Sequence, residues 1–162
     1  MLTQTALKKI LDYDPATGIF RWAVNCGTRA KAGAVAGWTN DRGYRCVGIK
    51  GKAYKLHRLA WLYMTGAFPN DGTDHKFGDK ADNRFKTLRV ADQAINQQNR
   101  RKANRNNTSG LLGAHFHKRL GKFCATIWAG NKLRHIGVYE TAEQAHAAYV
   151  SEKRRLHPGC TI

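Results

Sequence analysis

Residues 74–84 read Asp-His-Lys-Phe-Gly-Asp-Lys-Ala-Asp-Asn-Arg and carry the clearest local signal in the chain. The glycine, aspartates and asparagine of this stretch favour turns. The pattern predicts a short strand at residues 73–75, a loop over 78–86 and a second short strand at 88–90. Asp92 is a favourable N-cap residue, so we expect a helix from there to about residue 99.

The acidic residues of the chain concentrate around this stretch. The chain has 28 Lys and Arg against only 11 Asp and Glu, and five of these acids lie within residues 71–92. Asp79 and Asp82 are interpreted as turn residues. Asp74 differs because His75 follows it: the carboxylate offers a hard ligand for Mg²⁺, and an imidazole titrating near ~6.5 can accept a proton from water. The pair therefore suits phosphodiester hydrolysis.

The net charge indicates a polyanionic partner. The formal charge of +17 favours DNA or RNA, and the 162 residues suffice for one medium domain or two small ones. A membrane surface is less favoured because no helix combines a broad apolar face with a Lys-rich polar face. No apolar stretch approaches the ~20 residues of a membrane span, and no secretory pattern opens the chain, so we expect a cytoplasmic protein. The four widely spaced cysteines are interpreted as free thiols.

The flanking segments predict a β-rich region before this stretch and a small α+β region after it. The expected elements before it are a helix at 6–11 capped by Thr3, a strand at 19–22, a hairpin of 44–49 with 53–56, and a helix from 59 to 66. Those after it are strands at 113–117, 123–128 and 133–138 and a helix that Thr141 and Gln144 begin as a capping box.

Several segments together resemble the HNH homing endonucleases of bacteriophages. They are His57-Arg58-Leu59-Ala60-Trp61, residues 74–84, Leu88-Arg89 and Ile95-Asn96-Gln97-Gln98-Asn99. The resemblance covers residues 36–100 and implies a ββα-metal fold, in which two short strands and a helix surround one divalent ion, Mg²⁺ or Mn²⁺.

The resemblance also implies roles for individual side chains. His75 would be the general base, and Asp74 and Asn96 would be the metal ligands. Asn99 is placed to contact a phosphate. His57 is interpreted as a packing or hydrogen-bonding residue at a helix start, with a DNA contact as the alternative.

Thr87 departs from the family pattern, which has asparagine at this position to tie the metal loop together and orient the base. A threonine has a shorter reach and only a hydroxyl group. Asn83 could compensate as an orienting residue, and otherwise the rate would fall because small misplacements of a catalytic group are costly. Phe77, where the family has Asn or Asp, is a milder departure.

Residues 108–158 carry a second resemblance, to the APETALA-type, or ethylene-response-factor-type, DNA-binding domain. It rests on Ser109–Ala114, Gly121–Ala125, His135–Tyr139 and Thr141–Tyr149. That domain places a three-stranded sheet in the major groove and packs the other face of the sheet on its helix. The predicted DNA-binding residues are Arg100, Arg101, Lys102 and Arg105 of a basic linker, and His115, His117, Lys118, Arg119, Lys122, Trp128, Lys132 and Arg134 of the sheet region.

The sequence therefore predicts an α+β chain of two domains. An HNH nuclease domain with a β-rich lead-in would span residues 1–99, a basic linker 100–110 and the APETALA-type domain 111–162. We expect a monomer that nicks double-stranded DNA. The alternatives are a non-catalytic DNA-binding protein, whose HNH core Thr87 has made inactive, and a basic RNA-binding protein, which would leave the Asp-His pair unexplained.

Overall fold

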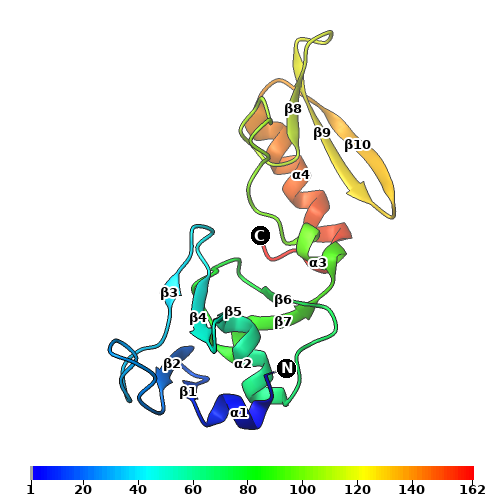
Figure 1. Ribbon diagram of the computed structural model, residues 1–162. Coiled ribbons are helices and arrows are strands. Elements are labelled where there is room, and N and C mark those ends of the chain that lie inside the picture. The colour runs from blue at the N-terminus through cyan, green and yellow to red at the C-terminus, as the bar shows by residue number, and fades with distance from the viewer. Residues whose placement is uncertain (1) are drawn as a thin grey trace. The chain divides into compact units, whose positions relative to one another are not determined.

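The structure, a computed structural model, describes residues 2–162 and contains two compact units, one ending at Gln93 and one spanning Ala94–Ile162 (Figure 1). The elements of the first unit are α1 (Gln4–Lys8), β1 (Leu11–Asp14), β2 (Ile19–Trp22), β3 (Trp38–Thr39), β4 (Arg45–Ile49), β5 (Lys52–Lys55), α2 (Leu56–Thr65), β6 (Gly72–His75), the 3₁₀ helix η1 (Phe85–Thr87) and β7 (Leu88–Ala91). The helix α3 (Gln93–Gln98) follows, and the second unit continues with β8 (Ala114–His117), β9 (Lys122–Ala129), β10 (Lys132–Tyr139) and α4 (Ala142–Leu156).

All the sheets formed by the described residues are small and antiparallel. In the first unit β1 pairs with β2, β4 lies between β3 and β5, and β6 pairs with β7. In the second unit β9 lies between β8 and β10, and α4 packs on this sheet. The predicted mixture of helices and small antiparallel sheets is confirmed, including the strand–strand–helix order of β6, β7 and α3.

The predicted helix over residues 6–11 is wrong in its second half. Thr3 caps the helix as expected, but α1 ends at Lys8 and Leu11–Asp14 form β1. The reason is the alternation in the sequence Leu-Asp-Tyr-Asp, which buries Leu11 and Tyr13 and exposes the two aspartates between and after them. That period of two suits a strand and not a helix.

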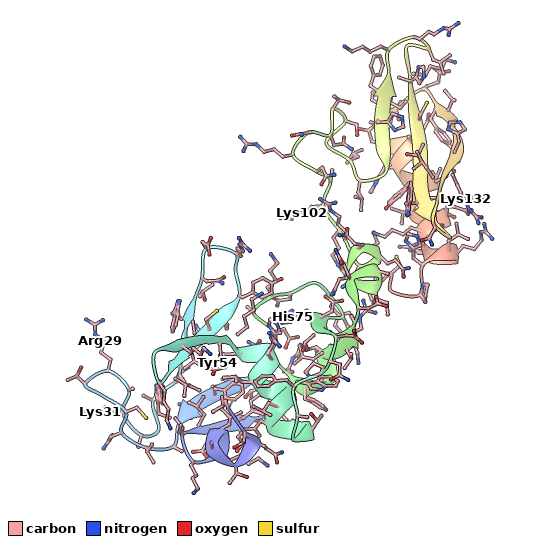
Figure 2. All side chains as sticks on the ribbon, turned by 45° about the vertical axis from the view of Figure 1, so that its right-hand side comes forward. Arg29, Lys31, Tyr54, His75, Lys102 and Lys132 are labelled. Atoms are coloured by element: carbon pink, nitrogen blue, oxygen red, sulfur yellow. The ribbon has the colours of Figure 1, made fainter. Side chains whose placement is uncertain are left out.

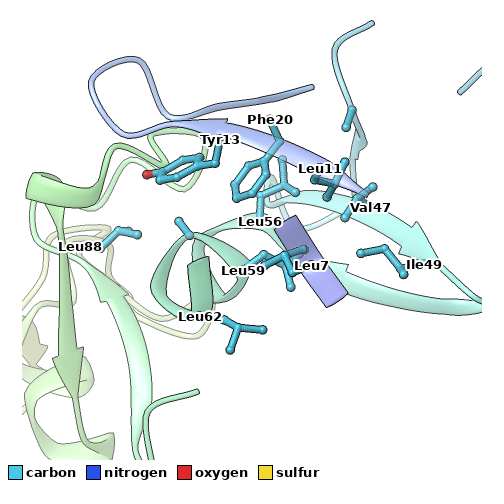
Figure 3. Packing of buried hydrophobic residues seen from close by; sticks show 12 residues of the cluster. Leu7, Leu11, Tyr13, Phe20, Val47, Ile49, Leu56, Leu59, Leu62 and Leu88 are labelled. Carbon is cyan, nitrogen blue, oxygen red and sulfur yellow. The ribbon is translucent and has the colours of Figure 1, made fainter. Parts of the chain in front are cut away.

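The first unit is built around α2. Leu56, Leu59 and Leu62 on this helix are almost fully buried, and they pack with Leu7 of α1 and Phe20 of β2 (Figure 3). Tyr13 and Leu88 belong to the same cluster, so the core reaches from the N-terminal hairpin to β7. The strands β6 and β7, which carry the candidate catalytic residues, are thereby anchored on the core.

The second unit has a core of its own. Ala114, Ala125 and Ile127 of the sheet pack against Ala145 and Tyr149 of α4. The helix begins with the predicted capping box, in which the Gln144 backbone N–H donates to the Thr141 hydroxyl and the Gln144 side chain accepts from the Thr141 backbone.

The division between the units differs from the predicted domains at α3 and at residues 100–110. Residues 94–110 belong to the second unit because the C-terminal segment holds them. The Lys153 ammonium donates to the Arg100 carbonyl, and the Arg101 guanidinium donates to the carbonyl and hydroxyl oxygens of Thr161 at 2.7 and 2.8 Å. The basic segment is therefore partly fixed to its own unit.

Candidate active site

The β6–β7 hairpin places Asp74 and His75 at the end of a strand. Its register pairs Asp74 with Arg89 and His75 with Leu88. The Arg89 guanidinium donates from Nε and Nη2 to Oδ2 of Asp74, at 3.2 and 2.9 Å. Both side chains are largely buried, so this charge-assisted pair holds the carboxylate at a fixed place on the hairpin.

His75 lies at the end of β6 with only 4% of its surface exposed (Figure 2). Burial lowers the pKa of its imidazole, because charging the ring would remove it from water without full compensation. The charge of Asp74 and the side chain of Asn83 oppose this effect by favouring the protonated ring. The net lowering of the pKa leaves the ring neutral at pH 7, in the form that accepts a proton.

Two further rings lie against His75. The His57 ring, at the start of α2, meets it nearly at right angles, with centroids 4.7 Å apart and an angle of 78° between the planes. The Tyr44 ring lies 5.4 Å from the His57 ring and 6.1 Å from the His75 ring, between centroids. We refer to Tyr44, His57 and His75 as the three-ring cluster.

The loop from β6 to η1 is closed by its own polar groups. The Thr87 hydroxyl donates to the Arg84 carbonyl at 2.7 Å, and the Lys76 backbone N–H donates to the Thr87 carbonyl at 2.9 Å. The Asn83 amide donates to the Ala81 carbonyl at 2.9 Å, and this side chain also acts on His75. Thr87 thus ties the loop to itself, whereas the Asn83 side chain acts on the imidazole by favouring its protonated form.

The N-terminal hairpin supports the loop from behind. The Tyr13 hydroxyl donates to the Asn83 carbonyl at 2.6 Å within the protein interior. At the β1–β2 turn, Gly18 has a positive φ of 76°, and a Cβ there would lie 2.5 Å from the Arg84 nitrogen. The backbone of the turn therefore packs directly on the backbone that carries Asn83.

We expect Tyr13→Phe to destabilise the first unit by about 1–3 kcal/mol, because the buried Asn83 carbonyl would lose its donor. Chemical denaturation followed by fluorescence would measure the change. Tyr63→Phe is the matched control, since its ring lies 5.6 Å from that of Tyr13 in the same core. Equal stability of Tyr13→Phe and the unmodified protein would contradict the supporting role of this hydroxyl group.

No local sequence pattern indicates the roles of Tyr13, Gly18, Tyr44 and Arg89, and the role of His57 was left open. Tyr13 and Asn83 are 70 positions apart, so no local pattern connects them. His57 offered one signal: Leu56, Leu59 and Ala60 recur at helical spacing and are buried, and His57 sits beside them on that face.

Asp74 suits a hard divalent cation, although the described residues form no dedicated cage. Among residues 2–162, no group of three His, Cys, Asp or Glu side chains gathers. Mg²⁺ commonly takes one or two carboxylates and completes its shell with water and substrate phosphate. A single carboxylate, largely buried and held in place by Arg89, fits that pattern and does not fit a structural zinc site.

The predicted ligand Asn96 lies on α3, in the second unit, and is exposed. Asn99, one turn further, is buried and accepts a hydrogen bond from the Thr161 hydroxyl at 2.5 Å. Asn99 is therefore buried within its own unit, whereas Asn96 is an exposed residue.

The sheet of the second unit sorts the predicted DNA-binding residues onto two faces. Ala125 and Ile127 are buried against α4, so the alternate positions of β9 face away from it. The register places on this open face the side chains of His115, His117, Lys122 and Trp128. Trp128 is 63% exposed there, and Lys122 forms an ion pair with Glu140.

Lys132 and Arg134 lie on the other face, because they pair with Ala129 and Ile127. Both are exposed near the β9–β10 turn, where Figure 2 labels Lys132. Lys118 and Arg119 stand in the turn between β8 and β9 and are also exposed. In the basic segment, Arg100, Arg101, Lys102 and Arg105 are all exposed.

Two findings concern the chain as a whole. Among the helices of residues 2–162, none has the length and apolar character needed to cross a membrane. The four cysteines are free, and Cys46 and Cys124 are buried as packing residues.

Part of the chain is similar to known proteins. No curated protein matches the chain. One similar solved structure is described as DNA binding and cleavage by the HNH homing endonuclease I-HmuI, with 24% identity and a TM-score of 0.43. The match covers 56% of this chain and 51% of that one, so the chain spans about half the length of that protein. Residues 54–98 match a family model described as HNH endonuclease, and this segment contains both Asp74 and His75.

Proposed function

We propose that the protein is a DNA endonuclease that hydrolyses phosphodiester bonds with one divalent ion, Mg²⁺ or Mn²⁺. The observation that carries the proposal is the buried, neutral His75 beside Asp74 at the end of β6, within a segment that matches HNH endonucleases. Burying a titratable imidazole brings no gain in stability that an apolar side chain would not also bring. Buried groups with shifted pKa values concentrate at functional sites.

His75 acts as the general base in this proposal. Its neutral ring takes a proton from a water molecule as the water oxygen attacks phosphorus. The bond between phosphorus and the 3′ oxygen breaks, and the leaving oxygen ends with a proton from solvent. Asn83 orients the imidazole from the loop, and Thr87 holds that loop closed through the Arg84 carbonyl.

Asp74 and Asn96 are the proposed ligands of the divalent ion. Asp74 would supply a carboxylate that Arg89 keeps in place, and Asn96 would supply an amide oxygen. When bound, the ion would neutralise charge on the phosphate and on the leaving oxygen. Arg89 limits the negative charge at the site before the ion and the DNA arrive.

The second unit is proposed to bind double-stranded DNA. We assign this role to the open face of its sheet and to the exposed basic segment, and we retain the APETALA-type domain as the proposed family of this unit. Phosphate contacts from the arginines and lysines would give an affinity that falls steeply with salt. Trp128, exposed beside Leu133 on this face, would lie against the DNA. Lys132 and Arg134 lie on the α4 side and would contact phosphates flanking the face.

The chain holds one Asp-His pair of this kind, so we propose a monomer that nicks one strand. A phage homing role, in the cytoplasm of the host cell, completes the proposal. Incubation of supercoiled plasmid and of phage genomic DNA with Mg²⁺ or Mn²⁺ tests it. We expect nicked circles that EDTA abolishes; linear product at early times would indicate a dimer.

A non-catalytic DNA-binding protein is the second candidate, and Thr87 is the observation that favours it. The Thr87 hydroxyl donates to the Arg84 carbonyl of the loop backbone, and Asn83 is the residue that acts on the His75 imidazole. If this candidate is right, the protein binds DNA tightly but does not cleave it with Mg²⁺ or with Mn²⁺. The Thr87→Asn variant should then gain cleavage activity. Cleavage by the unmodified protein would reject it.

A further inference from the structure

The placement of His57 is unusual for a packing residue. His57 is the second residue of α2, and only 3% of its surface is exposed. Its Nδ1 atom is buried and has no hydrogen-bond partner among the described residues. A leucine or phenylalanine at this position would bury no unsatisfied nitrogen, so stability of the core does not account for a histidine here.

The ring of His57 lies where it can constrain His75. The two rings meet edge to face, with centroids 4.7 Å apart, an arrangement that aromatic rings favour. The His57 ring thus adds a packing contact to the polar effect of Asn83 on the same imidazole. Burial, reinforced by His75 and Lys55, lowers the pKa of His57 to about 3, so this ring stays neutral while its neighbour takes up a proton.

The third ring of the cluster is itself fixed from two sides. The Lys55 ammonium, at the residue before α2, lies 4.2 Å from the centroid of the Tyr44 ring. The Lys80 ammonium lies 4.9 Å from the same ring and donates to the Arg42 carbonyl at 3.0 Å. Lys80 belongs to the loop that follows His75. The cluster therefore joins the β3–β4 turn, the start of α2 and the candidate catalytic loop.

We propose that His57 is a positioning residue whose ring, packed on Tyr44 and His75, fixes the orientation of the His75 imidazole for proton transfer. The inference rests on the proposed endonuclease function. It goes beyond that function by assigning His57 a role that acts through His75.

Single-turnover cleavage of plasmid by variants at this position tests the proposal. His57→Ala and His57→Gln remove the ring, and we expect each to lower the cleavage rate about 10- to 100-fold, the loss that follows from a misplaced catalytic group. His57→Phe keeps a ring and should retain a rate within about fivefold of the unmodified protein, with DNA affinity changed less than about twofold in all three. Leu62→Ala, in the same helix and core, is the control for general destabilisation and should cleave normally below its unfolding temperature.

A spectroscopic measurement separates this inference from the proposed function. In the metal-free protein, long-range ¹H–¹⁵N correlation reports the ring nitrogens of His75 whether or not the protein cuts DNA. We expect these signals to shift or broaden in His57→Ala and His57→Gln and to stay near their original positions in His57→Phe. Unchanged signals in the ring-less variants would overturn the inference, even if no variant cleaves.

The kinetic outcomes are equally decisive. Full activity in a folded His57→Ala or His57→Gln would show that the ring is dispensable. Equal losses in His57→Phe and His57→Gln would show that an aromatic ring at this position does not preserve activity. Weaker DNA binding in all the variants would make His57 a DNA contact. Each of these results would overturn the positioning role.

Discussion

His75→Ala should abolish plasmid nicking while DNA binding persists. Removing a general base typically costs a factor of about 10²–10⁴ in rate, which would reduce cleavage to the background of a plasmid assay. The expectation rests on the neutral ring that burial maintains at pH 7 and on the adjacent carboxylate of Asp74. Gel electrophoresis of plasmid after timed incubation with Mg²⁺ or Mn²⁺ measures the rate, and a shift assay on the same DNA measures binding.

His146→Ala is the matched control for this prediction. It also removes a histidine, but one on α4 whose Nδ1 lies 2.7 Å from the Leu112 carbonyl in the second unit. We expect it to cleave at the rate of the unmodified protein. Cleavage by His75→Ala within a few-fold of the unmodified rate would remove His75 from the chemistry and, with it, the proposed mechanism.

Local patterns in the sequence predicted the short elements that carry the site. The turn residues of 76–84 separate β6 from β7, and Asp92 precedes α3, as the spacing indicated. The capping box at Thr141 was also predictable, because both of its residues lie within one turn. Each of these features depends on neighbours in the chain, which a single sequence displays directly.

Contacts between distant segments could not be predicted in the same way. The bond from Tyr13 to Asn83 and the ring contact of His57 with His75 depend on how β1, α2 and β6 pack. Leu11 was mistaken for the end of a helix because it follows an apolar helical pattern, whereas pairing with β2 places it at the start of a strand. Such tertiary preferences override local propensity.

The sequence also could not predict which face of the sheet each basic residue occupies. Lys132 and Arg134 share a face with Ile127 because of the pairing of β9 with β10, and an irregularity between His135 and Gly137 shifts the register along β10. A one-residue shift moves every following side chain to the other face. All the candidate residues of the sheet region were therefore expected on the DNA side, whereas Lys132 and Arg134 lie on the side of α4.

Gly113→Ala should destabilise the second unit far more than Gly121→Ala does. Gly113 has a positive φ of 79°, and a Cβ there would lie 2.0 Å from Cγ and 2.1 Å from Cδ2 of Tyr149. The Tyr149 ring is itself buried in the core of α4 and the sheet, so it has little room to retreat. The left-handed conformation costs an alanine about 1–2 kcal/mol and overpacking about 1–3 kcal/mol more, so we expect a loss of about 2–5 kcal/mol.

Gly121→Ala separates the two contributions to this loss. Gly121 also has a positive φ, of 65°, but a Cβ there would meet no atom within 4 Å. Gly121→Ala should therefore lower the free energy of unfolding by about 1–2 kcal/mol through the backbone conformation alone, without a steric clash. Denaturation of the full chain, followed through amide exchange of β9 and α4, would report the second unit specifically. Exchange in α2 should stay unchanged in both variants, because that helix belongs to the first unit.

A double variant tests the contact between Gly113 and Tyr149 directly. Truncating the ring in Tyr149→Ala removes the atoms that the new methyl group would strike, so Gly113→Ala should cost little more than the backbone term in that background. The ring truncation is itself destabilising. The quantity to compare is therefore the change in the free energy of unfolding that Gly113→Ala causes with and without Tyr149→Ala. If Gly113→Ala is no more costly than Gly121→Ala, the close packing of Tyr149 on the Gly113 backbone does not hold the second unit together. If it is more costly, plasmid binding should weaken with it, since the proposed DNA-binding face exists only while β8, β9 and β10 are held on α4.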